Sequence, residues 1–193
     1  MTPVRKGELA AVVTSLEMST RPKPVVVPDS ALRLVAWKRP LLDSYRTLFK
    51  RVGGPWLWFS RLVMDDAGLA AIIHDEAVAI WAVVDTRGIE IGMLELDFRD
   101  AGQCEIGFFG LVPELAGKGH GRWLMAQTLG LAWRKDVTRV WVHTCTLDHP
   151  AALTTYMRNG FKPFARAVEH FADPRLLGVL GEDVAPHAPL IRY

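Results

Sequence analysis

The sequence predicts an α/β fold in which a mixed central sheet carries helices on both faces. Three strand-like segments follow one another at about residues 77–85, 89–98 and 103–112, and the short turn DAGQ separates the last two. Further along, segments with helical and strand periodicity alternate to about residue 170. This order of elements is typical of a mixed sheet covered on both faces by helices.

The first 30 residues differ in composition from the rest of the chain. The sequence GELAAVVTSLEMST suits a strand, but RPKP and VPD after it break any regular element. We therefore expect residues 1–30 to form an N-terminal arm or an extra edge strand. Residues 31–172 are expected to form the main domain, and residues 173–193 a Pro-rich tail packed on it.

The first elements of the main domain are a strand and two helices. Residues 31–37 alternate as a strand does, and a helix is expected from Pro40 to the GGP sequence at residues 53–55. Asp65 and Asp66 have the character of a helix cap, so a second helix is expected to follow them.

The second half alternates helix and strand. Helices are expected at about residues 119–134 and 150–158, on either side of a strand at residues 139–144. One or two further strands are expected after Gly160.

Composition and charge exclude several classes of protein. Half of the residues are apolar and the formal net charge is +2. The chain therefore lacks the excess of basic residues that is typical of proteins that bind nucleic acid or a membrane surface. No apolar run approaches the roughly 20 residues that span a bilayer, and the start of the sequence lacks a signal-peptide pattern. The cysteines, Cys104 and Cys145, favour a reducing compartment over a disulfide framework. We expect a cytoplasmic protein without nucleic-acid or membrane partners.

A glycine-rich loop, AGKGHG at residues 116–121, stands between a predicted strand and a predicted helix. A helix N-terminus exposes unpaired N–H groups and a partial positive charge, and glycines let a phosphate approach the backbone closely. Lys118 and Arg122 add cationic side chains. The loop is not a P-loop, because Gly119 follows Lys118 where Ser or Thr is required, and Arg122 stands where the dinucleotide fingerprint needs its third glycine.

Two motifs in the right order carry a family resemblance. VPELAGKGHGRWLM resembles the pyrophosphate-binding motif of the GNAT superfamily of N-acetyltransferases, and AALTTYMRNGFKPF resembles its second signature, with Tyr156 and Gly160 in the matching places. The expected elements match that fold from about residue 31 to residue 170. The resemblance implies a mostly antiparallel sheet with a splayed strand pair that holds coenzyme A. It also implies acetyl-CoA as cosubstrate, no metal, and an N-acetyltransferase that acts on a small-molecule or peptide amine.

The chain departs from the family pattern at two positions. Ala116 stands where Gln or Arg is usual, and His149 where Asn is frequent. Because the backbone N–H groups of the loop bind phosphate without either side chain, we expect these departures to change the affinity for the cofactor but not to abolish binding. The cofactor-binding residues that the resemblance implies are Phe109, Gly110, Leu111, Val112, Gly117, Lys118, Gly119, His120, Gly121, Arg122 and His149.

The resemblance also assigns a task to the strand before the loop. The strand at residues 103–112 is expected to carry a bulge and to part from the strand at residues 139–146, so that the pantetheine arm lies between them. The N–H of Phe109 is expected to polarise the thioester carbonyl, as in an oxyanion hole.

Glu105 is the first candidate for the base that accepts the amine proton. Its spacing to Gly119 is similar to that of family members with a glutamate base on this strand. A hairpin register that pairs Arg99 with Cys104 would place Glu105 on an apolar face, which would make it a stronger base. That face would also carry Leu94, Leu96, Phe98 and Phe109. A shift of one residue would instead leave Glu105 solvated, and Glu95 and Asp97 are held in reserve.

Tyr156 matches the family tyrosine that protonates the departing thiolate. A phenol suits this task because it is a neutral donor at pH 7. The alternative is a core tyrosine on the stripe of a helix.

Other candidate features say less about function. The pattern of His143, Cys145 and His149 matches no strong zinc site, and a core or pocket-lining role is preferred. The resemblance implies that the aromatic sequence PWLWF at residues 55–59 borders the acceptor site, where it would form an apolar acceptor pocket or a partner-facing patch; the alternative is ordinary core. The amine, the acyl chain length and a homodimer stay open. The competing function is an acyl-CoA-binding sensor or interaction domain with weak turnover, which Ala116 would favour.

Overall fold

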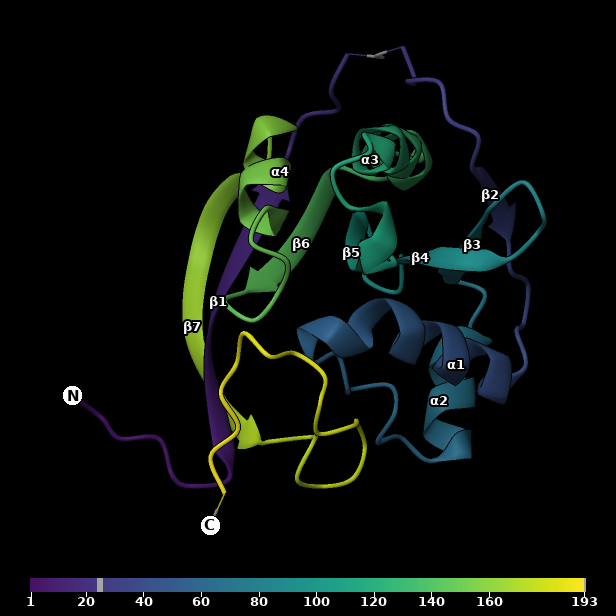
Figure 1. The fold of residues 1–193 in the computed structure, drawn as a ribbon. Helices are drawn as coiled ribbons and strands as arrows, with labels where there is room; N and C mark the ends of the chain where they lie inside the picture. Colours follow the sequence, from purple (N-terminus) through teal and green to yellow (C-terminus); the bar gives the residue numbers. More distant parts are fainter. Residues whose placement is uncertain (24–25, 193) are drawn as a thin grey trace.

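The computed structural model describes residues 1–23 and 26–192, and their strands form one seven-stranded sheet (Figure 1). The strands are β1 Glu8–Met18, β2 Arg33–Ala36, β3 Val78–Val84, β4 Glu90–Asp97, β5 Gln103–Leu111, β6 Arg139–Cys145 and β7 Lys162–Ala172. They lie in the order β2-β3-β4-β5-β6-β1-β7. Only β5 and β6 pair in parallel, and every other neighbouring pair is antiparallel. The mixed, mostly antiparallel sheet predicted from the sequence is confirmed.

Helices cover both faces of this sheet, as predicted. They are α1 Leu42–Gly53, α2 Asp66–Ile73, α3 His120–Ala132 and α4 Ala152–Arg158, with 3-10 turns η1 Gly54–Trp56 and η2 Pro113–Leu115. In Figure 1, α1 and α2 lie below β4 and β5, α3 lies above them, and α4 lies over the upper part of β1. The carboxylate of Asp65 accepts a hydrogen bond of 2.7 Å from the Gly68 N–H, which confirms the predicted cap of α2.

Two apolar clusters hold these layers together. α1 buries Tyr45, Phe49 and Val52 against β3 and β4. On the other face, α3 buries Met125 against Leu94 of β4 and Val142 of β6. Apolar residues at helical spacing thus face a sheet whose central strands are buried on both sides.

The N-terminal segment differs from the expected edge strand. β1 pairs with β6 on one side and with β7 on the other, so it is an internal strand. β7 takes the edge position, and its side chains are almost all exposed.

The C-terminal segment packs on the same side of the sheet as α1 (Figure 1). Arg175 is buried and bonds Asp173 at 2.7 Å between Nη2 and Oδ2. The same guanidinium donates to the carbonyl of Ala188 at 2.8 Å. Leu180 and neighbouring residues pack against Leu57, so this tail closes a third small cluster.

The pairing of β4 with β5 contains a bulge at Gly107. Glu95 lies opposite Phe108, whereas the next pair along is Leu96 with Ile106. The bulge predicted for this strand is confirmed, and so is the parting of β5 from β6. Those two strands pair only from Gln103 to Glu105 of β5.

Candidate functional site

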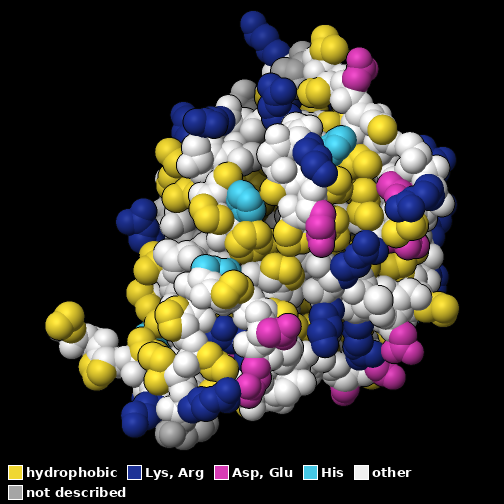
Figure 2. All heavy atoms as spheres, in the orientation of Figure 1, with side chains coloured by type: hydrophobic (Ala, Val, Ile, Leu, Met, Phe, Trp, Pro, Cys, Tyr) yellow, Lys and Arg dark blue, Asp and Glu magenta, His cyan; other side chains and the backbone are white. Residues whose placement is uncertain are grey.

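The gap between β5 and β6 opens into a cavity of about 1030 Å³. Its walls are residues 105–112 of β5 and the turn after it, residues 142–145 of β6, and parts of α3 and α4. Apolar side chains and histidines gather on this face of the molecule, between α3 and α4 above and α1 below (Figure 2). The cavity therefore occupies the place where the sheet stops being continuous.

The glycine loop forms one end of the cavity. Gly117 and Gly119 have φ of 74° and 83°, a conformation that favours glycine, and α3 begins directly afterwards at His120. A Cβ added at Gly117, Gly119 or Gly121 would meet no atom within 4 Å, so the backbone here faces open space. Together with the N-terminus of a 13-residue helix, this arrangement suits a phosphate group.

Two predicted contacts of this loop are not part of the cavity wall. Arg122 lines the cavity, whereas Lys118 and His120 do not. The Nδ1 of His120 lies 3.1 Å from the hydroxyl of Ser30, so this imidazole joins the loop to the segment between β1 and β2.

Only half of the predicted N–H groups on β5 can reach a ligand. The Val112 N–H donates to the Ile91 carbonyl of β4 at 2.9 Å. Because successive N–H groups of a strand point to opposite sides, those of Gly110 and Val112 face β4. Those of Phe109 and Leu111 face the gap. The N–H of Phe109, the predicted thioester donor, thus faces the gap, whereas the N–H of Val112 is used by β4.

Gly110 allows the cavity wall to pack closely on α1. A Cβ at this position would come within 2.8 Å of Val52 and 3.1 Å of Trp58. Glycine is therefore required here for packing, in addition to any contact of its backbone with a ligand.

Tyr156 of α4 lies in the wall of the cavity, between two aromatic rings. Its ring centroid is 6.1 Å from that of Phe109 and 5.9 Å from that of Phe161. Burial, and secondarily the charge of Asp148, raises the pKa of the phenol. Within the described residues its hydroxyl bonds no protein group, so it is a protonated donor available to a ligand.

Glu105 also lines the cavity, but not in the surroundings expected for it. It lies opposite Asp97 and not on the face of Leu94 and Leu96. The predicted register holds beyond the bulge, where Leu94 pairs with Phe109, and is wrong between the bulge and the turn. The apolar face expected for Glu105 is therefore wrong, because the extra residue at Gly107 moves the strand by one position.

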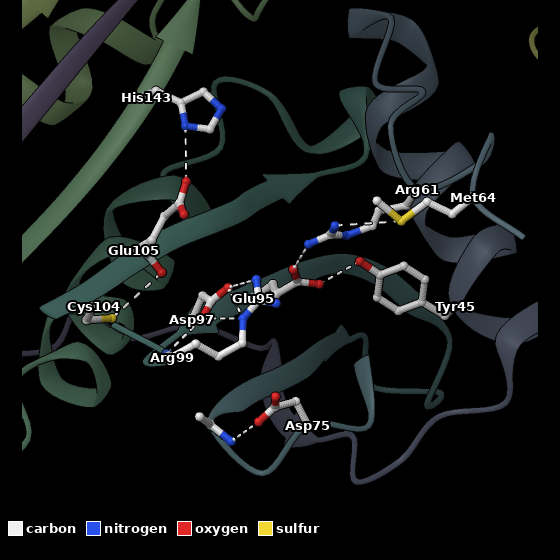
Figure 3. Close-up of polar contacts among 11 residues, drawn as sticks. Tyr45, Arg61, Met64, Asp75, Glu95, Asp97, Arg99, Cys104, Glu105 and His143 are labelled. Atoms are coloured by element: carbon white, nitrogen blue, oxygen red, sulfur yellow. Dashed lines mark hydrogen bonds and ion pairs between the residues drawn. The ribbon is translucent and has the colours of Figure 1, made fainter. Parts of the chain in front are cut away.

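The partner of Glu105 is a histidine of β6. The Nδ1 of His143 lies 3.2 Å from Oε1 of Glu105 (Figure 3). The side chain of His143 is 49% exposed and that of Glu105 is 26% exposed. The hydrogen bond to Glu105 raises the pKa of His143, against the opposing effect of burial. The sequence predicted a core or pocket-lining role for His143 but did not pair it with Glu105.

The reserve carboxylates are both held by other side chains (Figure 3). Glu95 is fully buried and accepts hydrogen bonds from Tyr45 at 2.6 Å and from Arg61 at 2.7 Å. Burial and the neighbouring charge of Glu95 raise the pKa of Tyr45 well above its ordinary value. Asp97 bonds Arg99 at 2.9 Å.

The aromatic segment at residues 55–59 borders the cavity and also joins the core. Leu57 is buried in the third cluster and touches the cavity, and Trp58 lines the cavity and donates from Nε1 to Asp148 at 3.0 Å. Trp56 stacks edge-on against His149, with ring centroids 4.9 Å apart. Asp148 was not singled out by sequence, although an acid directly after a strand and before a helix is a usable signal.

Metal-ligating residues do not cluster in the described residues: no group of three or more His, Cys, Asp or Glu side chains is placed to hold an ion. Cys104 and Cys145 are free thiols. No described helix has the length and apolar character needed to cross a membrane.

The sequence model of the acetyltransferase (GNAT) family matches residues 41–161. The chain belongs to this family. Among curated proteins, none matches the chain significantly. The matched residues of this GNAT chain include β5, the glycine loop and α4, and thus most of the cavity wall.

Solved structures with the same fold include a GCN5-related N-acetyltransferase from Sphaerobacter thermophilus. It is 16% identical with a TM-score of 0.57, over 87% of this chain and 52% of that chain. A mutant spermidine/spermine N-acetyltransferase from Vibrio cholerae is 21% identical with a TM-score of 0.55, over 78% and 98% of the two chains. A tandem GNAT protein of clavulanic acid biosynthesis is 17% identical with a TM-score of 0.54, over 87% and 55%. At these identities the likeness establishes the fold alone.

This chain is shorter than several of the proteins it resembles. It spans 62%, 52% and 63% of the length of three of them. The activity, substrate and partners of the whole protein are therefore proposals.

Proposed function

We propose that this GNAT chain transfers an acetyl group from acetyl-CoA to a primary amine by direct attack in a ternary complex. The main support for this proposal is the cavity between β5 and β6, which is lined both by the glycine loop and by Glu105. The cofactor supplies an activated acetyl thioester. The amine is a small molecule or a peptide, and the amine substrate of the Vibrio cholerae neighbour shows only that this fold accommodates such acceptors.

The chain's residues fit coenzyme A along the length of the cavity. The backbone at the glycines before and at the start of α3 borders open space, and the N-terminus of α3 suits the pyrophosphate. The N–H groups of Phe109 and Leu111 face the gap. There the carbonyl groups of an extended pantetheine arm would accept their hydrogen bonds, as the carbonyls of an adjacent strand do. The Phe109 N–H then stabilises negative charge that develops on the thioester oxygen.

Proton movements are assigned to the two remaining residues. Attack by the amine nitrogen forms the new N–C bond and breaks the C–S bond. The surplus amine proton passes to Glu105, directly or through water. Tyr156, kept protonated by burial, donates to the departing sulfur. Holding two reactants side by side supplies much of the rate without a covalent enzyme intermediate.

A panel of amines incubated with acetyl-CoA, with free thiol as the readout, tests this function. We expect thiol release that depends on one class of amine and that falls by about 10²-fold or more in Glu105→Gln. Coenzyme A binding, measured by calorimetry, should not change in that variant. Glu90→Gln is the matched control, because Glu90 is exposed at the start of β4 and outside the cavity.

The competing function gives a different result in the same assay. An acyl-CoA-binding sensor would bind coenzyme A with no amine-dependent thiol release in the wild-type protein. Turnover that Glu105→Gln leaves unchanged would remove Glu105 from the mechanism.

A further inference from the structure

The backbone brings Glu105 and His143 together at the point where β5 and β6 separate. Glu105 pairs with Trp141 in the last step of the parallel ladder. His143 is two residues beyond Trp141, so its side chain projects from the same face of the sheet. The two side chains meet at 3.2 Å, and both line the cavity.

The contact fixes which nitrogen of His143 carries the proton. A carboxylate accepts hydrogen bonds, so the nitrogen that faces Glu105, Nδ1, is the protonated one. In the neutral ring the lone pair then lies on Nε2. Within the described residues Nε2 bonds no protein group, and half of the side chain is exposed. A histidine oriented by a carboxylate with a free second nitrogen has the arrangement of a general base.

The two reserve carboxylates of β4 do not offer the same chemistry. Glu95 is occupied by Tyr45 and Arg61. Asp97 accepts a hydrogen bond from the guanidinium of Arg99, which is permanently charged. In the described residues Glu105 alone among these acids is bonded to a group that titrates near neutrality.

We propose that Glu105 and His143 form a single proton-accepting pair, in which His143 Nε2 receives the proton of the attacking amine and Glu105 positions the ring. The inference rests on the proposed function, and in it His143 takes the place of the water between the amine and Glu105. The N–H bond of the amine breaks, its electrons stay on nitrogen, and the proton binds Nε2. The imidazolium pairs with the Glu105 carboxylate and afterwards loses the Nε2 proton to solvent.

Charged groups around the pair set its titration. Asp148, after β6, and Glu169, on β7, add negative charge that raises the pKa of His143 beyond the effect of Glu105. Glu17 of β1 lies on the same face as His143 but is held by Arg139 at 2.7 Å.

Cations near the pair are already matched by acids. On the β4 side, Arg99 bonds Asp97, and Arg61 bonds Glu95. The surroundings therefore favour the imidazolium, which is the product of proton acceptance.

The first test is a double-mutant cycle on kcat with one amine found in the panel. His143→Gln and Glu105→Gln should each lower kcat by about 10²-fold or more, and the double variant should be no slower than the slower single variant, because the two residues act as a unit. His74→Gln is the matched control, because His74 lies at the end of α2 outside the cavity and glutamine can still bond the Pro40 carbonyl. The proposal would be overturned if the losses in kcat of the two single variants multiplied in the double variant, or if His143→Gln kept the kcat of the wild type.

The second test separates the pair from a structural role of His143. The rising limb of the kcat/KM profile should lie above pH 6.5 in the wild type and move to lower pH in Glu105→Gln. The ionisation of the amine contributes equally to both profiles, so a difference between the two limbs comes from the enzyme. A limb that is identical in wild type and His143→Gln contradicts the proposal.

A third measurement needs no activity. The NMR titration of the His143 ring in the wild-type protein should give a pKa above its ordinary value, and Glu105→Gln should lower it. If no amine releases thiol, the proposed function fails while this titration still reports on the pairing. If turnover occurs and the titration does not change, the inference alone fails.

Discussion

The hydroxyl of Tyr45 donates a 2.6 Å hydrogen bond to the buried carboxylate of Glu95, which joins α1 to β4 beside the bulge of β5. Arg61 bonds the other oxygen of the same carboxylate, so the segment before α2 is tied to the same point. Gly107 lies against Glu95 at the bulge: a Cβ there would lie 3.5 Å from its Oε1. This network therefore supports the place where β5 turns away from regular pairing.

Tyr45→Phe is expected to destabilise the protein by about 1.5–3 kcal/mol, because it removes a donor from a buried charged acceptor. Urea unfolding measures the change. Tyr156→Phe is the matched control, because the Tyr156 hydroxyl bonds no described protein group, and its stability should change little. Equal effects of the two substitutions would contradict the assigned hydrogen bond.

Arg61→Met is expected to cost about 3–5 kcal/mol, because it leaves the Glu95 carboxylate buried without its cation. Adding Glu95→Leu together with Tyr45→Phe should restore much of the loss, since apolar side chains then replace the ion pair and no buried hydroxyl is left without its acceptor. The same unfolding assay measures both variants. A triple variant less stable than Arg61→Met alone would show that the ion pair is not the reason for the cost.

Gly119→Ala is expected to weaken coenzyme A binding and to cost about 1–2 kcal/mol of stability, because Gly119 has φ of 83°. Gly130→Ala, inside the helix that follows Gly119, is the matched control. A Cβ at Gly130 meets nothing within 4 Å, and alanine in a helix interior should stabilise by about 0.5–1 kcal/mol. Calorimetry with coenzyme A and thermal unfolding follow both effects; unchanged binding in Gly119→Ala would contradict the role of the loop.

Tyr156→Phe is expected to lower kcat by about 10²-fold and to leave coenzyme A affinity unchanged, because only the donor to the departing sulfur is lost. Since burial raises the pKa of Tyr156, its deprotonation should not produce a falling limb in the wild-type profile below about pH 10. Steady-state kinetics across pH measures both. Full turnover in the Phe variant would make Tyr156 a core residue of α4 only.

His143→Gln is expected to cost more stability in acid than in base. The folded pKa of His143 is raised above 6.5, so the charged pair with Glu105 stabilises the fold fully below about pH 6.5 and loses its effect as the pH rises through the folded value. Urea midpoints of wild type and variant at about pH 6 and about pH 9 should therefore differ more at the lower pH. A pH-independent difference would show that the ring contributes by packing alone.

Most elements of this fold were accessible from the sequence, because periodicity and punctuation residues mark them. The cap at Asp65 and the glycines before α3 were placed correctly for this reason. β1 was harder to place, because local pattern reports burial but does not name the neighbouring strands.

The candidate site was only partly accessible. The family motifs placed Tyr156 and the glycine loop at one cavity, where the structure also has them. The surroundings of Glu105 were wrong because a bulge of one residue reverses the face of every side chain on one side of it. Its contact with His143 depends on a parallel register between distant strands, which a linear pattern does not contain.

The most direct test of the proposed acetyl transfer is the stoichiometry of one reaction, with free thiol and N-acetylated amine measured together by mass spectrometry. The wild-type protein should produce the two in equal amounts with a suitable amine, and Glu105→Gln should produce both much more slowly. Thiol without acetylated amine, or bound coenzyme A with neither product, would contradict the assignment of this cavity as an N-acetyltransferase site.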